Sequence, residues 1–273
     1  MAGAAWVLVR EMLQNTFRDA ENLEQRTGYT VLGQIPVIQE RKRTKLLQYL
    51  TDKPTSAAAE SVRNMRTSLL LADTANPPQV IMSTSSIPGE GKTTQSLSLA
   101  QNLAGLGKKV LIVEADVRKR IFAEYFDVKR AGSMMSVLSG TDSLEAAVYH
   151  LDDLNIDVLV SGDPLGNPAD IFSSQAFATM MQEIRGVYDY IVLDTPPVLA
   201  VPDPRIIGRH VDTTIYTVRW DSTSHRQVAE GLKMLKQVNV PIAGLVLSQI
   251  NAKGQKRYGN GDQTYSYDGY HQN

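Results

Sequence analysis

The chain has 273 residues, of which 42% are hydrophobic and 21% charged, with a formal net charge of −1 and no cysteine. This composition is ordinary for a globular protein that can bury a sizeable core. It excludes disulfides, thiolate metal sites and cysteine nucleophiles, and it offers no overall positive charge for binding nucleic acid or anionic lipid.

The first 53 residues are predicted to form an N-terminal helical arm and a linker. The apolar run at 4–9 is too short to span a bilayer and no cleavable signal peptide follows it, so we expect a cytoplasmic chain. Helical spacing of apolar residues over 6–24 predicts an amphipathic helix. That helix either packs on its own domain or a partner, or lies beside a membrane segment that is lost or separately encoded.

A short strand is predicted over 30–37, and a polar, basic run follows at 40–45. Such a run is typical of a solvated linker, and contact with anionic lipid headgroups is the alternative. The next helix is predicted over 56–72 and carries three charged residues at i, i+3 and i+6, namely Glu60, Arg63 and Arg66. These side chains form either a salt-bridge ladder on one helix or a contact between neighbouring subunits.

The stretch from 80 to 104 gives the first indication of chemistry. A buried strand at 80–83 leads into the loop Ser86-Ile87-Pro88-Gly89-Glu90-Gly91-Lys92-Thr93, and helical periodicity follows. The loop has the spacing of a phosphate loop, except that Ser86 stands at the position of the first glycine. Backbone N–H groups and the positive end of a helix bind phosphate oxygens in such loops. We therefore predict a nucleotide phosphate site rather than a plain turn before a helix.

Within this loop each residue type has a specific use. Gly89 and Gly91 allow the backbone to approach the phosphates closely. Lys92 would reach the β- and γ-phosphates, and the Thr93 hydroxyl would ligate Mg²⁺.

Two further strands end in carboxylates. The apolar run 109–113 leads to Glu114 and Asp116, which point to the same side of a sheet end. The run 190–193 leads to Asp194, and Pro196-Pro197 then stops the strand. Ligands of open α/β sheets bind at this edge, so we interpret these carboxylates as organisers of Mg²⁺ and phosphate, with strand-end caps as the alternative for the first pair.

The remaining elements complete the fold. Short helices are predicted at 133–140 and 144–150, a strand at 158–162, a helix near 173–186, strands at 213–218 and 242–249, and a helix between them at 224–237. The alternation from 80 to 250 predicts an α/β fold with a doubly wound, mostly parallel sheet flanked by helices. We place this domain at 54–253.

The last segment, 254–273, is polar and aperiodic, so we expect it to be flexible. It contains four of the chain's 11 tyrosines, Tyr258, Tyr265, Tyr267 and Tyr270. This concentration indicates a function for the hydroxyls, and a low-complexity polar end is the alternative.

From about Gly28 to its end the chain resembles the bacterial tyrosine kinases (BY-kinases) that accompany capsular and exopolysaccharide export. The loop 86–93 is similar to their Walker A motif, and Asp194 with the two prolines to Walker B. The segment 114–118 resembles Walker A′, Asp-x-Asp-x-Arg, with glutamate in place of the first aspartate. The charged residues of the 56–72 helix match the Glu-x-x-Arg-x-x-Arg signature with which the family builds a ring.

The resemblance implies a P-loop fold related to MinD and ParA, with ATP and Mg²⁺ as cofactors. The implied catalytic residues are Lys92, Glu114, Asp116 and Asp194, with Glu114 as proton acceptor for the tyrosine hydroxyl. The implied metal ligands are Thr93, Asp116 and Asp194. The implied nucleotide contacts are Ser86, Pro88, Gly89, Glu90, Gly91, Lys92, Thr93, Thr94 and Arg118. The four tail tyrosines are the implied phosphoacceptors.

The implied partners are further copies of the chain in a ring, a membrane polysaccharide co-polymerase that activates the kinase, and a cognate tyrosine phosphatase. This arrangement would place the chain at the cytoplasmic face of the inner membrane, with no nucleic acid partner. Two other functions stay open. One is a partition-type ATPase with water as the acceptor, although the lysine that opens the loop in those proteins is missing here. The other is a nucleotide switch without catalysis.

Overall fold

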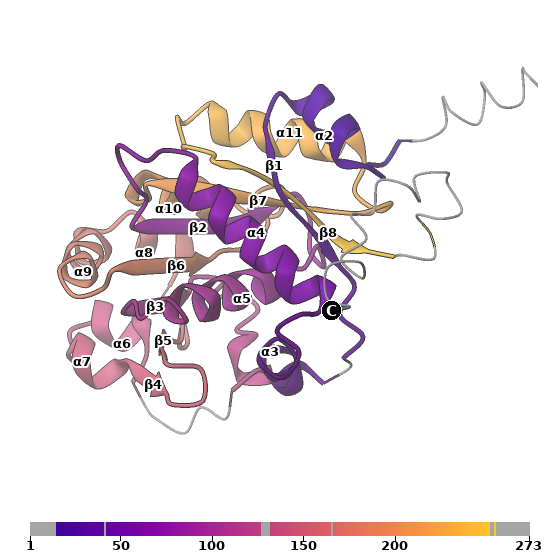
Figure 1. Cartoon of the computed structure of the whole chain (residues 1–273). Helices are drawn as coiled ribbons and strands as arrows, with labels where there is room; N and C mark the ends of the chain where they lie inside the picture. Colours follow the sequence, from indigo (N-terminus) through magenta and orange to yellow (C-terminus); the bar gives the residue numbers. More distant parts are fainter. Residues whose placement is uncertain (1–14, 41, 127–131, 165, 252–253, 255–273) are drawn as a thin grey trace, which may run out of the picture.

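The computed structural model describes residues 15–40, 42–126, 132–164, 166–251 and 254. Within these ranges one sheet has the strand order β1-β8-β7-β2-β6-β3-β5-β4 (Figure 1). The strands are β1 (Val31–Pro36), β2 (Val80–Ser85), β3 (Val110–Glu114), β4 (Tyr149–Leu151), β5 (Ile156–Leu159), β6 (Tyr190–Asp194), β7 (Thr213–Arg219) and β8 (Gly244–Ile250). All neighbours pair in parallel except β4 and β5, which confirms the predicted doubly wound, mostly parallel fold.

Helices cover both faces of this sheet, each over its own apolar cluster. One face carries α3 (Arg43–Asp52), α4 (Ala57–Leu71) and α5 (Lys92–Ala104), and α4 runs obliquely across the strands in Figure 1. The other face carries α2 (Ala20–Thr27), α6 (Met134–Leu138), α7 (Leu144–Ala147), α8 (Pro168–Phe172), α9 (Gln175–Arg185), α10 (Asp203–Ile207) and α11 (His225–Lys236). The central strands β2, β3 and β6 are therefore buried on both sides, as their continuous apolar runs require.

Of the N-terminal helix predicted over 6–24, the described part is helical only from Ala20, and the prediction is wrong for 15–19. Helix α2 begins at Ala20, because the Asp19 side chain accepts the Asn22 N–H at 2.6 Å and caps the helix there. Before it, Phe17 is buried against the His225 ring, 4.4 Å between centroids, in a stretch that runs beside Ser224. Residues 1–14 lie outside the described part. The domain boundary at residue 54 stays a prediction, although β1 already pairs with β8 in the main sheet.

Two further local predictions are corrected, and one short helix was not predicted. The basic run 40–45 is not a linker throughout, since α3 begins at Arg43 and buries Leu46, Leu47 and Leu50. The end of the predicted helix 144–150 is an extended Val148 followed by β4. The helix α10 was not predicted, because five residues are too few to show a period. Among the described residues, no helix combines the length and apolar character needed to cross a membrane.

Candidate functional site

The loop between β2 and α5 presents backbone amides at a helix N-terminus. Gly91 is the N-cap of α5 and adopts φ 89°, a left-handed conformation that favours glycine. Gly89 is also left-handed, at φ 85°. Because glycine has no side chain with which to cap α5, the first N–H groups of the helix can serve a bound anion instead.

Two loop side chains that we assigned to the nucleotide turn into the protein instead. The Ser86 hydroxyl is buried 2.9 Å from the Tyr216 hydroxyl, which explains why this loop tolerates serine at its first glycine position. The Glu90 carboxylate accepts the Ile87 N–H at 2.7 Å and the Thr223 hydroxyl. Burial raises the pKa of Glu90. Both residues therefore shape the loop, and only their backbone can face a ligand.

Three functional groups of the predicted site converge around Lys92. Its Nζ lies 3.2 Å from Asp116 Oδ2 and 3.5 Å from Asp194 Oδ1. The Thr93 hydroxyl donates to Asp194 Oδ2 at 2.7 Å. The parallel register of β3 and β6 brings the carboxylates together, since Glu114 pairs with Asp194 at their carboxyl ends. Burial raises the pKa of Asp194, against the opposing effects of Lys92 and Thr93.

Glu114 lies in the same row but faces away from the solvent. Its carboxylate accepts the Phe122 N–H at 2.7 Å, the Ser161 N–H at 3.1 Å and the Ser161 hydroxyl at 2.9 Å. Burial raises the pKa of Glu114, while these hydrogen bonds oppose the shift. The contacts give Glu114 a structural use, in which it fixes the segment after β3 to the end of β5.

A cavity of about 420 Å³ opens beside these groups. Of the residues predicted to bind nucleotide or metal, it is lined by Pro88, Gly89, Gly91, Lys92, Thr93, Thr94 and Asp116. Asp194 lies beneath it, behind Thr93. Arg118 does not line it; its half-exposed guanidinium reaches Asp203, with Nε 3.3 Å from Oδ2. The four predicted phosphoacceptor tyrosines lie outside the described residues.

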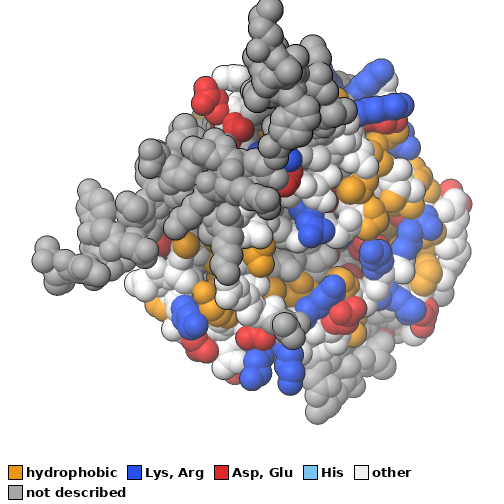
Figure 2. Space-filling view, turned by 90° about the vertical axis from the view of Figure 1, so that its right-hand side faces the viewer, with side chains coloured by type: hydrophobic (Ala, Val, Ile, Leu, Met, Phe, Trp, Pro, Cys, Tyr) orange, Lys and Arg blue, Asp and Glu red, His pale blue; other side chains and the backbone are white. Residues whose placement is uncertain are grey.

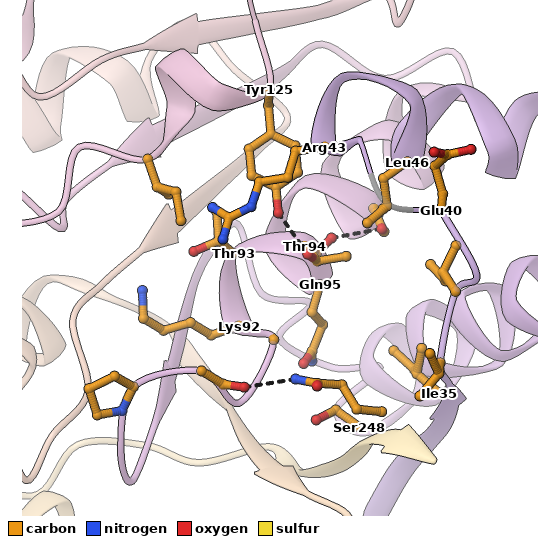
Figure 3. A pocket seen from close by; sticks show the side chains of 18 of the residues that line it. Ile35, Glu40, Arg43, Leu46, Lys92, Thr93, Thr94, Gln95, Tyr125 and Ser248 are labelled. Carbon is orange, nitrogen blue, oxygen red and sulfur yellow. Dashed lines mark hydrogen bonds between the residues drawn. The ribbon is translucent and has the colours of Figure 1, made fainter. Parts of the chain in front are cut away.

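The far wall of the cavity was missed by sequence reasoning (Figure 3). It is built by residues from four segments, namely the end of β1 with the residues that follow it, α3, the stretch around Tyr125, and β8. These residues are Ile35, Pro36, Val37, Ile38, Arg43, Leu46, Tyr125, Ser248 and Gln249. The Tyr125 hydroxyl lies 2.7 Å from the Thr94 hydroxyl, and the Arg43 guanidinium stands 5.7 Å from the Tyr125 ring centroid. No motif marks these positions, because only the pairing of β1 with β8 and the packing of α3 bring them to the loop.

The charged residues on α4 lie away from this cavity. Glu60 pairs with Arg63 at 2.8 Å within the helix, and Arg66 donates to the Asn102 carbonyl at 3.2 Å. One chain thus satisfies part of the predicted salt-bridge ladder by itself. On the side shown in Figure 2, basic side chains are interspersed with acidic, hydrophobic and neutral ones, and the visible described residues form no continuous basic surface.

Comparison with known proteins agrees with this geometry. A family model described as an AAA domain matches residues 79–240. The tyrosine-protein kinase Etk of Escherichia coli K12 is 30% identical over 270 residues, covering 92% of this chain and 37% of Etk. The tyrosine-protein kinase YwqD of Bacillus subtilis 168 is 32% identical over 207 residues, covering 76% of this chain and 87% of YwqD.

The solved kinase domain of Escherichia coli Etk has the same fold, with a TM-score of 0.80 at 28% identity over 86% of this chain and 95% of that domain. The chain spans 37% of the length of the first curated relatives. YwqD, by contrast, is matched over most of its own length. Together with the phosphate loop and the carboxylates at the ends of β3 and β6, these matches show that the chain belongs to the bacterial tyrosine-protein kinase family.

Proposed function

We propose that this chain is an ATP-dependent protein-tyrosine kinase domain that phosphorylates its own C-terminal tyrosines. One observation carries the proposal: Lys92, Thr93, Asp116 and Asp194 converge beside a helix N-terminus at the carboxyl edge of a parallel sheet. Phosphoryl transfer requires positioning and charge neutralisation more than covalent chemistry, and this cluster can supply both.

The residues present fit Mg²⁺. Asp116 and Asp194 are 2% and 0% exposed and share the single ammonium of Lys92 in the hydrogen-bonded cluster, so a buried negative charge is left under-compensated. Thr93, Asp116 and Asp194 offer oxygen ligands, which Mg²⁺ prefers. When bound, the ion would supply neutralisation of the phosphate oxygens.

The lining of the cavity supports the assignment of a nucleotide. Lys92 and the amides of the loop would hold the phosphates. The part of the wall that contains Ile35, Val37 and Leu46 is apolar, which suits the face of a nucleobase. Of Glu114, Asp116 and Asp194, Asp116 is the one that lines the cavity, so we assign to it rather than to Glu114 the orientation of the acceptor hydroxyl. A phenol of pKa about 10 is protonated at neutral pH and profits from such a neighbour.

The acceptors in this proposal are Tyr258, Tyr265, Tyr267 and Tyr270 of an adjacent subunit. A ring built through Glu60, Arg63 and Arg66 would hold a neighbour's tail at high effective concentration beside the cavity. Each phosphate adds about −1.5 to −2 charges, so a multiply phosphorylated tail would repel itself and leave the site, loosening the ring. A membrane polysaccharide co-polymerase would activate the kinase at the inner membrane, a tyrosine phosphatase would reverse it, and polymerisation and export of exopolysaccharide or capsule would respond.

Intact-mass spectrometry after incubation with Mg-ATP tests the proposal. The parent chain should gain successive phosphates, whereas Lys92→Met and a variant with phenylalanine at all four tail tyrosines should gain none. Steady ADP release that survives the phenylalanine changes would indicate a partition-type ATPase instead. Nucleotide binding without transfer or ADP release, even with a peptide of the activating partner, would indicate a switch. Sedimentation of the fully phosphorylated chain as an intact ring would contradict the loosening step.

A further inference from the structure

Strand β8 contains an irregularity directly beside the phosphate loop. Between Leu247 and Ile250 it has one residue more than β1 has between Gln34 and Pro36, which makes a β-bulge. Gln249 in this bulge has φ 54°, a left-handed conformation that is unfavourable for a residue with a side chain. Backbone strain of this kind persists only where surrounding contacts enforce it, and it concentrates at functional sites.

The bulge aims two consecutive side chains at two consecutive carbonyls of the loop. The Ser248 hydroxyl donates to the Glu90 carbonyl at 2.6 Å. The Gln249 side-chain amide donates to the Gly89 carbonyl at 2.8 Å. A Cβ on Gly91 would stand 3.2 Å from Gln249 Nε2, so the absent side chain of Gly91 leaves room for this contact.

The direction of each carbonyl also fixes the direction of the N–H group in the same peptide. In a trans peptide the C=O of one residue and the N–H of the next point in opposite directions, and the described chain contains no cis peptide. Holding the Gly89 and Glu90 carbonyls toward β8 therefore turns the N–H groups of Glu90 and Gly91 away from β8. Phosphate loops bind the phosphates with N–H groups of this stretch.

We propose that Ser248 and Gln249 are positioning residues that orient the phosphate-binding amides of Glu90 and Gly91. This inference rests on the proposed function only in that the loop binds a nucleoside phosphate. The left-handed backbone at Gln249 turns the side chain of this β8 residue toward the phosphate loop. The Glu90 carboxylate, which accepts from Ile87 and Thr223, also holds this turn.

Dissociation constants for Mg-ADP and Mg-ATP, measured with melting temperatures, test the proposal. Gln249→Gly removes the donor and also relieves the left-handed strain, so a structural role and a positioning role predict different results. We expect nucleotide affinity to fall about three- to tenfold, the effect of one lost hydrogen bond, while the melting temperature stays equal or rises. Ser248→Ala should weaken binding to a similar extent, and Ser248→Thr should restore it, because threonine keeps the hydroxyl.

Gln101→Ala is the matched control. Like Gln249→Gly, it removes a glutamine side chain that donates a hydrogen bond. The Gln101 amide donates to the Thr51 hydroxyl at 2.6 Å and not to the phosphate loop, so nucleotide affinity should stay unchanged. Unchanged affinity in both Gln249→Gly and Ser248→Ala, or a threonine variant no better than alanine, would overturn the proposal. A parent chain that binds neither nucleotide would overturn it together with the proposed function. A parent chain that binds nucleotide but transfers no phosphate would contradict the proposed kinase activity alone. The comparison of nucleotide affinities would still test the role of Ser248 and Gln249.

Discussion

The two ends of the central strands use aspartate in opposite ways. At the carboxyl ends, Asp194 is completely buried and shares Lys92 with Asp116, and burial raises its pKa. At the amino ends, Asp212 accepts the Val80 N–H at 2.7 Å, the Gln79 N–H at 2.9 Å and the Arg185 guanidinium at 2.7 Å. Burial opposes ionisation of Asp212, but these hydrogen bonds outweigh it and lower its pKa.

This difference between the two aspartates indicates that Asp212 contributes to stability and Asp194 to function. The chain itself satisfies the charge of Asp212, so this residue ties β2 and β7 to the end of α9 and contributes to folding. The hydroxyls of Thr93 and Ser96 donate to Asp194, but Asp194 and Asp116 share the one ammonium of Lys92 in a buried place. This shortage of positive charge costs stability and, in our proposal, provides a place for a cation. In our proposal, the residues at the amino end of the sheet contribute to folding and those at the carboxyl end bind the ligand.

The largest effect should come from Asp194→Asn. We expect phosphate transfer to fall about 10²- to 10³-fold or more, because a charged group that organises the phosphoryl site is lost. The melting temperature of the ligand-free chain should stay equal or rise, because asparagine removes a buried charge and can still accept from Thr93. Transfer is measured as phosphate gained per chain over time.

Asp163→Asn is the control for this prediction, since Asp163 is 88% exposed and pairs with Arg120 near the same edge of the sheet. It should leave both transfer and melting temperature near the parent values. A marked loss of stability in Asp194→Asn would mean that the carboxylate is already satisfied by the chain, and the contrast between the two ends would fail.

A smaller and opposite effect is expected from Asp212→Ala. The variant leaves the Gln79 and Val80 N–H groups without their acceptor, so the free energy of unfolding should fall by about 1–2 kcal/mol. Denaturation by urea measures this change, and transfer should stay within about twofold of the parent because the site lies at the other end of β2. Asp153→Ala, at an exposed position, should change neither. Loss of transfer with unchanged stability would reverse our assignment of the two ends.

The functional residues at the carboxyl end of the sheet were easier to predict from the sequence than the contacts at its amino end. Lys92, Thr93, Asp116 and Asp194 stand at fixed positions in motifs or at the ends of buried strands, so motif spacing and strand periodicity together predicted that they lie close to one another. Asp212, Gln79 and Arg185 follow no motif, and their contacts depend on how β7 and α9 pack. The orientation of a side chain was equally hidden, as Glu114 shows: its position was predicted, but only the hydrogen bonds to Phe122 and Ser161 reveal that it faces the protein.

The same limit applies to β8 and to α3. The strand was predicted, but a bulge adds one residue without disturbing the apolar pattern enough to be seen, and it decides where Ser248 and Gln249 point. The helix α3 was not predicted, because its first residues belong to a basic run that is typical of a linker. Its apolar residues are buried because the helix packs beside α5. Both elements supply walls of the cavity.

The smallest predicted effect is a difference in pH dependence between Asp194→Asn and Asp212→Asn. Asp212 has a folded pKa below its unfolded value of about 3.8, so its contribution to stability is complete above that value and is lost as the pH falls through the folded pKa. Asp194 has a raised folded pKa, so the folded chain holds the proton more tightly, and its contribution falls as the pH rises from about 3.8 toward the folded pKa.

Urea unfolding of the parent and both variants from about pH 3 to pH 7 measures these slopes. Groups common to all three proteins cancel when each variant is subtracted from the parent. The parent-minus-variant stability should rise with pH for Asp212→Asn and fall with pH for Asp194→Asn. The Asp212 term is the weaker one, because this residue and Arg185 are both about one third exposed and water screens the pair. A parent-minus-variant stability that rises with pH for both variants would show that the chain already matches both carboxylates, and the carboxyl end of the sheet would then hold no uncompensated charge for a cation. A difference that falls with pH for both variants would show that the chain leaves Asp212 unmatched as well.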